Sequence, residues 1–285
     1  MELNYKEIVP ETMKLISDEE FKLIRDLVYE KVGINLTDQK KALVTGRLQK
    51  VLRDKNFKSF ADYYNFIIND KTGEALSELV DKISTNHTFF GREYEHFDYF
   101  QKVVLPELVQ KKLKKNERDL RIWSAGCSTG EEPYTLVILM KEYFGNEYHK
   151  WDAGVLATDI STVALSKAIA GIYDKNRLHN FDTKLREKYF IKNNDTYIIK
   201  DEIKREVTFK RFNLMNDIFP FKKPFDVIFC RNVMIYFDTE TRMQLINKFY
   251  NILDNGGYFF IGHSETIDRR YTKFKYIMPA AYKKE

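Results

Sequence analysis

The residues with the clearest chemical potential lie between Arg121 and Tyr134, in the order Arg-Ile-Trp-Ser-Ala-Gly-Cys-Ser-Thr-Gly-Glu-Glu-Pro-Tyr. This order predicts a strand, a tight glycine turn and the start of a helix. Such a turn lets a cofactor approach the main chain closely and presents backbone N–H groups to it. The same residues fit G-x-S-x-G, the nucleophile elbow of serine hydrolases, with Asp226 and His263 in the right chain order to serve Ser128. Two chemistries therefore compete for this turn.

The two acids that open the helix, Glu131 and Glu132, favour one of them. They suit the helix dipole, but they would repel a phosphate group and disfavour ATP or NAD. They would also place negative charge beside the oxyanion of a hydrolase reaction. A positively charged cofactor without phosphate, such as S-adenosylmethionine, fits better. Arg92, in a polar and aromatic segment before the sheet, could pair with the carboxylate of its methionine part.

Strands and helices must bring these residues together, and they alternate from about Arg121 onward. We expect strands at Arg121–Ala125, Val155–Thr158 and Phe225–Cys230, with helices at Pro133–Phe144 and Thr162–Ala170. Repeated strand–helix units predict a mainly parallel, doubly wound sheet, in which ligands bind at the carboxyl ends of the strands. The glycine turn, Asp159 and the pair Arg231-Asn232 follow three such ends. An acid in the position of Asp159 suits ribose hydroxyls.

The last part of the chain continues the pattern with an interruption. A helix is expected at Thr239–Leu253, ending at Gly256-Gly257, and strands at Tyr258–Ile261 and Tyr276–Tyr282. Between them and the earlier units, Tyr197–Ile199 and Val207–Phe209 alternate like short antiparallel strands, which predicts a small insertion.

The first 80 residues predict helices only. Ser17 and Glu20 form a capping box ahead of a helix that Gly33 stops, a second helix covers about 39–52, and a third ends near Asn69. Between Lys40 and Lys58 there are seven basic residues and one acid, whereas the whole chain has a net charge of only +5. Arg47, Lys50 and Arg53 share one side of the second helix. This side is either a solvated helix face or a docking surface for an acidic partner.

Composition excludes several classes of protein. The 285 residues include 22 Phe and 18 Tyr, which is enough for a packed core, and no apolar run approaches the roughly 20 residues that span a bilayer. The N-terminal residues lack the apolar run of a secretory signal. Cys127 and Cys230 have no metal-ligand spacing, and we expect reduced core thiols in a cytoplasmic protein with no metal site.

The chain resembles the CheR-type chemoreceptor glutamate O-methyltransferases from about Ser17 to Tyr282. The motifs that carry this resemblance are Asn86-His87-Thr88, Arg92-Glu93, Trp123–Tyr134, Ala157–Ile160, Asn213-Leu214, Phe225–Asp238 and Gly262–Glu265. The resemblance favours a cofactor over a nucleophile at the glycine turn. One departure is Gly91, which stands where many members have the second Phe of a Phe-Phe pair.

The resemblance implies an α/β protein with an all-helical N-terminal domain (1–82), a linker and cofactor lid (83–120) and a Rossmann-like S-adenosylmethionine-dependent methyltransferase domain (121–285) with a β-subdomain at about 172–212. It implies Tyr236 and Arg92 as catalytic residues. The implied cofactor contacts are Asn86, Thr88, Arg92, Gly126, Glu131 or Glu132, Asp159, Asn213, Leu214, Arg231 and Asn232.

The implied reaction transfers the methyl group of S-adenosylmethionine to glutamate carboxylates of methyl-accepting chemotaxis receptors and leaves S-adenosylhomocysteine. Arg47, Lys50 and Arg53 would then dock the acidic helical bundle of the receptor. We expect a monomer with no nucleic-acid partner and no membrane insertion. The short loop 191–196 lacks glycine, so we expect no dependence on a receptor C-terminal pentapeptide. The alternatives are a nucleic-acid methyltransferase, disfavoured because no Pro-Pro pair is present, and a cofactor-sensing module without turnover.

Overall fold

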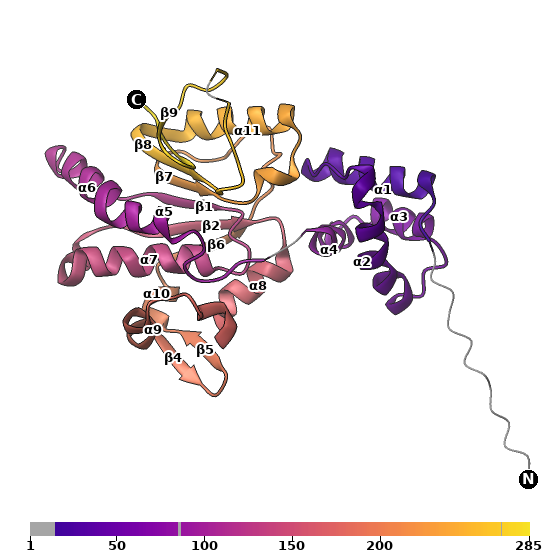
Figure 1. Ribbon diagram of the computed structural model, residues 1–285, viewed down its shortest axis with the longest axis horizontal. Helices are drawn as coiled ribbons and strands as arrows, with labels where there is room; N and C mark the ends of the chain where they lie inside the picture. The colour runs from indigo at the N-terminus through magenta and orange to yellow at the C-terminus, as the bar shows by residue number, and fades with distance from the viewer. Residues whose placement is uncertain (1–14, 85–86, 269) are drawn as a thin grey trace, which may run out of the picture.

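The computed structural model describes residues 15–84, 87–268 and 270–285. Figure 1 shows a group of N-terminal helices beside one end of a larger domain that contains the main sheet. The N-terminal helices are α1 (Asp18–Val32), α2 (Lys41–Asp54), α3 (Phe60–Asn69) and α4 (Glu74–Ile83). They enclose a hydrophobic core of their own. Residues of the sheet domain, including Ile160, Tyr236 and Phe237, pack against that core, so the two domains share a packed boundary.

Local chemistry fixes the ends of α1 as the sequence predicts. The Ser17 hydroxyl accepts the N–H of Glu20 at 3.1 Å, and the Glu20 carboxylate accepts the N–H of Ser17 at 3.0 Å. This capping box satisfies two N–H groups that have no partner within the helix. Gly33 ends the helix with φ = 72°, a left-handed conformation that favours glycine. Helix α2 begins at Lys41, after a 3-10 turn over Asp38–Lys40, slightly later than expected.

The larger domain is built on a seven-stranded sheet in the order β6-β2-β1-β7-β8-β10-β9. Its strands are β1 (Ile122–Ala125), β2 (Val155–Asp159), β6 (Val207–Arg211), β7 (Phe225–Cys230), β8 (Leu253–Ile261), β9 (Lys275–Met278) and β10 (Ala281–Lys283). The first five strands in this order are parallel, and β10 pairs antiparallel with both of its neighbours, β8 and β9. The strand order reverses between β1 and β7, the point at which ligands bind in such sheets.

Helices cover both faces of the sheet. Ile122 and Trp123 are neighbours on β1 and belong to different core clusters, because successive strand residues point to opposite faces. One face packs on α7 (Glu131–Phe144) and on the helical run from α5 (Tyr94–Tyr99) through a π-helical turn into α6 (Leu105–Lys114). The other packs on α11 (Thr239–Ile252). Helix α8 (Thr162–Ala170) packs near β2 and β6 and also contacts α4 of the N-terminal domain.

A small antiparallel sheet projects from this domain (Figure 1). It contains β3 (Ile172–Asp174), β5 (Thr196–Ile199) and β4 (Phe190–Asn193), in that spatial order, with α9 (Thr183–Tyr189) before β4 and α10 (Asp201–Lys204) after β5. The expectation that Val207–Phe209 belongs to it was wrong. These residues lie in β6, which pairs in parallel with β2, because the chain has already returned to the main sheet.

Two other expected elements also differ. Helix α11 gives way to β8 at Leu253, so Gly256 and Gly257 lie within a strand and not at a helix end. The expected strand Tyr276–Tyr282 is a hairpin of β9 and β10. Ala280 lies between the two strands with φ = 61°, which turns the chain back on itself.

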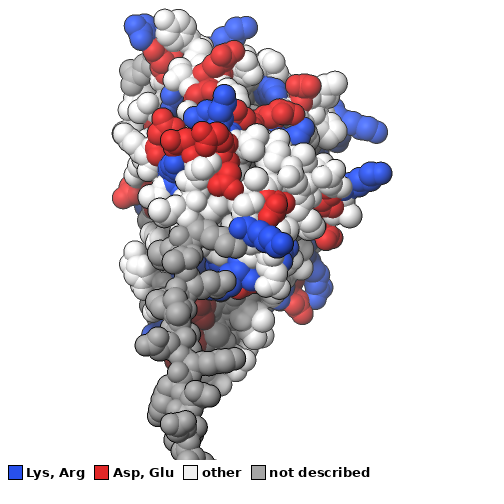
Figure 2. Space-filling model, turned by 90° about the vertical axis from the view of Figure 1, so that its right-hand side faces the viewer, with Lys and Arg blue, Asp and Glu red and all other residues white. Residues whose placement is uncertain are grey.

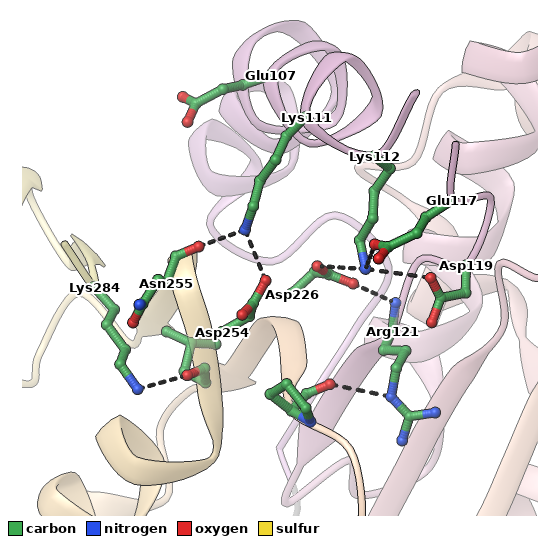
Figure 3. A network of polar contacts seen from close by, with 12 residues as sticks. Glu107, Lys111, Lys112, Glu117, Asp119, Arg121, Asp226, Asp254, Asn255 and Lys284 are labelled. Atoms are coloured by element: carbon green, nitrogen blue, oxygen red, sulfur yellow. Dashed lines mark hydrogen bonds and ion pairs between the residues drawn. The ribbon is translucent and has the colours of Figure 1, made fainter. Parts of the chain in front are cut away.

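At the opposite end of the strands from the glycine turn, a polar network joins α6 to the sheet (Figure 3). The Lys112 ammonium lies 3.1 Å from the Asp226 carboxylate and 3.3 Å from that of Asp119. Asp226 is 1% exposed and also accepts the main-chain N–H of Arg121 at 2.9 Å. Both charges of this pair are withdrawn from water, so the network fixes α6 against the first residues of β1 and β7.

Candidate active site

One cavity lies at the carboxyl ends of β1, β2 and β7, where the sheet topology predicts a ligand site. Among the residues that the sequence analysis selected, its lining includes Thr88, Arg92, Gly126, Glu132, Asp159, Asn213, Leu214, Arg231, Asn232 and Tyr236. Asn86 lies outside the described residues. The N-terminal domain also contributes to the wall, with Val32, Ile34, Val80 and Ser84. Sequence reasoning missed these residues, since nothing in a helical pattern shows which end faces a second domain.

The two adjacent acids at the start of α7 have different surroundings. Glu132 lines the cavity, and its carboxylate accepts the Ser124 hydroxyl at 2.7 Å. Glu131 is fully buried and is not part of the lining. Its carboxylate accepts the Thr129 hydroxyl at 2.7 Å and lies 3.4 Å from the Arg177 guanidinium. Burial raises the pKa of the Glu131 carboxyl. Helix geometry brings only Glu132 to the cavity, because neighbouring residues of a helix point about 100° apart.

The glycine turn is shaped for close approach by another part of the chain. Gly126 has φ = 82°, and a Cβ there would overlap the Val233 side chain. The Asp159 carboxylate, at the end of β2, accepts the N–H of Ser128 at 2.7 Å and that of Ser161 at 2.9 Å. Burial raises the pKa of the Asp159 carboxyl, and these N–H donors oppose the rise. The turn is therefore fixed by the acid at the end of the neighbouring strand.

The structure does not assemble a serine hydrolase. Ser128 Oγ is buried and has no hydrogen-bond partner within the described part of the chain. Asp226 is near the start of β7, whereas Ser128 follows the carboxyl end of the parallel neighbour β1, so the two lie at opposite ends of the strands. His263 is exposed and packs edge-on against the ring of His96.

Arg231 organises the polar wall of the cavity. It is buried, and its guanidinium lies 2.9 Å from the Glu132 carboxylate and 3.0 Å from that of Glu93. It also donates to the carbonyl oxygen of Arg92. Although burial raises it, the pKa of the Glu93 carboxyl is lowered on balance by the charge of Arg231. One cation thus connects the end of β7, the start of α7 and the segment that carries Arg92.

The segment that carries Arg92 is also held by a residue next to the small antiparallel sheet. Arg177, in the 3-10 turn after β3, donates to the carbonyl oxygen of Thr88 as well as facing Glu131. Gly91, the departure from a Phe-Phe pair, forms a turn before Arg92. Its φ of 77° is a left-handed conformation that favours glycine. The Arg92 guanidinium donates to the carbonyl oxygen of His87 at 2.6 Å and lines the cavity.

Tyr236 lies where the two domains meet. It follows β7 in a 3-10 turn over Met234–Tyr236, lines the cavity and packs against the N-terminal core. Its carbonyl oxygen accepts the N–H of Asn35 at 2.8 Å. The Lys40 ammonium lies 5.7 Å from the centre of its ring. The Tyr236 side chain, which carries the candidate hydroxyl, is therefore held by contacts with both domains.

Three residues near Arg231 offer atoms of the kind that bind metals. Glu93, His96 and His263 place one candidate ligand atom each within 4.8 Å of one another. However, Arg231 lies 3.0 Å from the Glu93 carboxylate and already supplies a positive charge there. Burial, with the nearby charge of Arg231, lowers the pKa of His96 to about 3. The fixed charge of the Arg231 guanidinium therefore opposes the binding of a metal cation beside it.

The basic residues of α2 do not form a uniform surface. The Arg47 guanidinium donates to the carbonyl oxygens of Ile83 at 2.7 Å and Ser84 at 3.2 Å, at the end of α4. Lys50 and Arg53 are exposed, and Arg53 lies 3.8 Å from Asp54. Figure 2 shows basic and acidic side chains interspersed on the face at this end of the molecule. Among the described residues, no helix is long and apolar enough to cross a membrane.

The comparisons with known proteins agree with this geometry. Residues 19–84 match the model of the CheR methyltransferase all-alpha domain, and residues 86–282 match that of the CheR methyltransferase SAM binding domain. The chain is 47% identical to the chemotaxis protein methyltransferase of Borreliella burgdorferi over 95% of this chain and 96% of that one. It is 33% identical to the chemotaxis protein methyltransferase of Escherichia coli K12, over 90% and 88%.

The fold and the site thus define an S-adenosylmethionine-dependent methyltransferase with a helical N-terminal domain. Within that class, the chain belongs to the CheR methyltransferase family.

Proposed function

We propose that this enzyme methylates glutamate side chains on the cytoplasmic helical bundle of chemoreceptors, as a monomer in the cytoplasm. The observation that carries the proposal is the placement of Tyr236 and the cofactor candidates around one cavity whose wall both domains build. Lys50 and Arg53 lie exposed on the same N-terminal domain. Their positive charge suits a substrate rich in glutamate.

The residues around the cavity fit S-adenosylmethionine. Asp159 follows β2, where an acid suits ribose hydroxyls, and Arg92 offers a guanidinium to a carboxylate. The lining sets the carboxylates of Glu132 and Asp159 beside two guanidinium groups, which suits a ligand that carries both positive and negative charge and no phosphate. Thr88, Gly126, Asn213, Leu214, Arg231 and Asn232 complete the set that we assign to the cofactor. When bound, the cofactor supplies an electrophilic methyl group on a sulfonium.

The chemistry required of the protein is modest. A glutamate carboxylate has an ordinary pKa of about 4.3, so it is already the nucleophile at neutral pH and needs no general base. The task of the chain is to hold the carboxylate in line and to exclude water, which can contribute several kcal/mol. Because both residues line the cavity, we assign Tyr236 to orient the incoming carboxylate and Arg92 to hold the cofactor.

The test is transfer of tritiated methyl from S-adenosylmethionine to membranes that contain chemoreceptors, followed by mild alkali. Label released as methanol is expected, because glutamyl methyl esters are alkali-labile. Receptors whose methylation-region glutamates are changed to alanine serve as the control. Alkali-stable label, or label on the control receptors, would contradict the proposal.

We also propose that the enzyme needs no receptor C-terminal pentapeptide. Strands β4 and β5 pair from Phe190↔Ile199 to Asn193↔Thr196, so only Asn194 and Asp195 connect them. Family members that grip such a peptide have a longer, glycine-rich loop at this point. Calorimetric titration with a receptor C-terminal pentapeptide is expected to give no heat of binding, and micromolar affinity would contradict this.

A further inference from the structure

Glu265 is a buried carboxylate that the reaction itself does not use. It follows β8, is 4% exposed and does not line the cavity. One of its oxygens accepts the N–H of Gly262 at 2.6 Å and that of Asn232 at 2.9 Å, and the other accepts the N–H of Ile235 at 3.1 Å. Burial raises the pKa of the Glu265 carboxyl, while these backbone donors oppose the rise. The carboxylate therefore gathers three main-chain donors from two chain segments.

Two of those donors belong to the loop after β7, which carries Arg231, Asn232 and Tyr236. Asn232 has φ = 59°, a left-handed conformation that residues other than glycine adopt at some cost. A Cβ on Gly262 would overlap Asn232, so the loop also packs directly on the turn that holds Glu265. A strained loop of this kind persists only where the surroundings hold it in place.

We propose that Glu265 is a positioning residue, which holds the loop after β7 so that Asn232 and Tyr236 face the cavity. The proposal rests on the assignment of these two residues to the cofactor and substrate. Glu265 acts through backbone hydrogen bonds and touches neither reactant. Its effect reaches both cofactor affinity and turnover, because one loop carries residues for both.

A carboxylate is needed because both of its oxygens accept. Glutamine at this position has one acceptor oxygen and an NH₂ group, which is only a donor. In Glu265→Gln, the NH₂ group must face either the Ile235 N–H or the pair from Gly262 and Asn232. Either choice sets donor against donor and leaves a buried N–H without a partner, which is costly.

The experiment compares Glu265→Gln and Glu265→Asp with Glu202→Gln, which makes the same change of charge at an exposed position in α10. Calorimetry measures the Kd for S-adenosylhomocysteine, kcat is measured at saturating cofactor, and hydrogen exchange of the full chain is followed peptide by peptide. We expect Glu265→Gln to raise Kd by about tenfold or more and to lower kcat per titrated cofactor site. Exchange should rise in peptides covering residues 231–237 and remain slow elsewhere, whereas Glu202→Gln should match the parent protein.

Asn232→Ala separates this proposal from the assignment of the site. If Asn232→Ala weakens S-adenosylhomocysteine binding and Glu265→Gln leaves Kd and kcat unchanged, the positioning role is wrong while the site stands. Unchanged binding in Asn232→Ala would overturn the assignment on which the proposal rests. If Glu265→Gln does not fold, Glu265→Asp, which keeps both oxygens on a shorter arm, must show the local rise in exchange. A rise spread over all domains would mean a purely structural role and overturn the proposal.

Discussion

The main-chain N–H of Asn35 donates a hydrogen bond of 2.8 Å to the carbonyl oxygen of Tyr236. The donor belongs to the N-terminal domain and the acceptor to the loop after β7, 201 positions later in the chain. Asn213 strengthens the same boundary, since its amide donates to the carbonyl oxygen of Lys31 at 2.7 Å. The domain that carries the basic helix is thus bonded directly to the backbone of the residue that we place at methyl transfer.

This relationship makes Tyr236→Phe a clean test of the tyrosine hydroxyl. The backbone hydrogen bond with Asn35 and the packing of the ring are retained, so only the hydroxyl is lost. We expect kcat for receptor methylation to fall at least about tenfold, because one group that orients the carboxylate is removed. The Kd for S-adenosylhomocysteine should not change. Tyr271→Phe, at an exposed position, is the matched control. A normal kcat in Tyr236→Phe would reduce the residue to a packing role.

For the basic face of α2, the informative variant is Lys50→Ala with Arg53→Ala. Both side chains are exposed, so their removal should lower kcat/KM for receptors by about tenfold at low ionic strength, and less as salt screens the attraction. Cofactor affinity should remain intact. Lys184→Ala with Lys192→Ala makes an equal change of charge on the small antiparallel sheet and its helix. Equal methylation rates for the two double variants across a salt series would contradict docking by this face.

Arg47 needs a separate expectation. From the sequence, Arg47 is expected only to dock the receptor, together with Lys50 and Arg53. The Arg47 guanidinium binds carbonyl oxygens at the end of α4, and Ser84 there lines the cavity. We therefore expect Arg47→Ala alone to weaken binding of S-adenosylhomocysteine as well as receptor methylation. Calorimetry on the single variant checks this, and an unchanged Kd would restore the simpler docking role.

The small antiparallel sheet should influence the cofactor through Arg177. Arg177→Ala removes the cation nearest to the buried Glu131 carboxylate and the donor to the Thr88 carbonyl. We expect the Kd for S-adenosylhomocysteine to rise by about three- to tenfold, the equivalent of one hydrogen bond. Lys175→Ala, an exposed change of the same charge in the same turn, should have no effect. Matching affinities in the two variants would remove Arg177 from the support of the site.

The buried pair in Figure 3 predicts how stability depends on pH. Lys112→Met leaves the Asp226 carboxylate buried without its cation, which should cost about 3–5 kcal/mol of unfolding free energy at pH 7. Burial already raises the pKa of Asp226 above its ordinary value. A raised carboxyl pKa means that the folded state holds the proton more tightly, so its stability falls as pH rises through that range.

The measurement is urea unfolding of Lys112→Met between pH 4.5 and 8. The loss of unfolding free energy in Lys112→Met, relative to the parent protein, should be smallest at the acid end of this range, where Asp226 can be protonated. The loss should grow as pH rises. Adding Asp226→Asn should recover part of the loss at pH 8, because the uncompensated charge is gone. A deficit independent of pH would show that Lys112 contributes packing only.

Elements whose signals are local could be predicted from the residues alone. The capping box of Ser17 and Glu20 and the stop at Gly33 are found where they were predicted, because neighbouring residues supply the hydrogen bonds concerned. The strand–turn–helix around Gly126 also has the expected bounds, although its turn is fixed by hydrogen bonds to Thr158 and Asp159 of the neighbouring strand. The carboxyl ends of β1, β2 and β7 also bring Gly126, Asp159 and Arg231 to one cavity, as the parallel pattern requires.

The tertiary structure was needed for the features that depend on contacts distant in sequence. It separated Glu132 at the cavity from the buried Glu131 and placed Val207–Phe209 in the main sheet. It also brought the guanidinium of Arg47, from α2, to the carbonyl oxygens at the end of α4. None of these follows from periodicity, since a helix or strand pattern states which residues share a face and not what that face meets. The role that we infer for Glu265 has the same origin, because its three N–H partners come together only when β7 and β8 lie side by side.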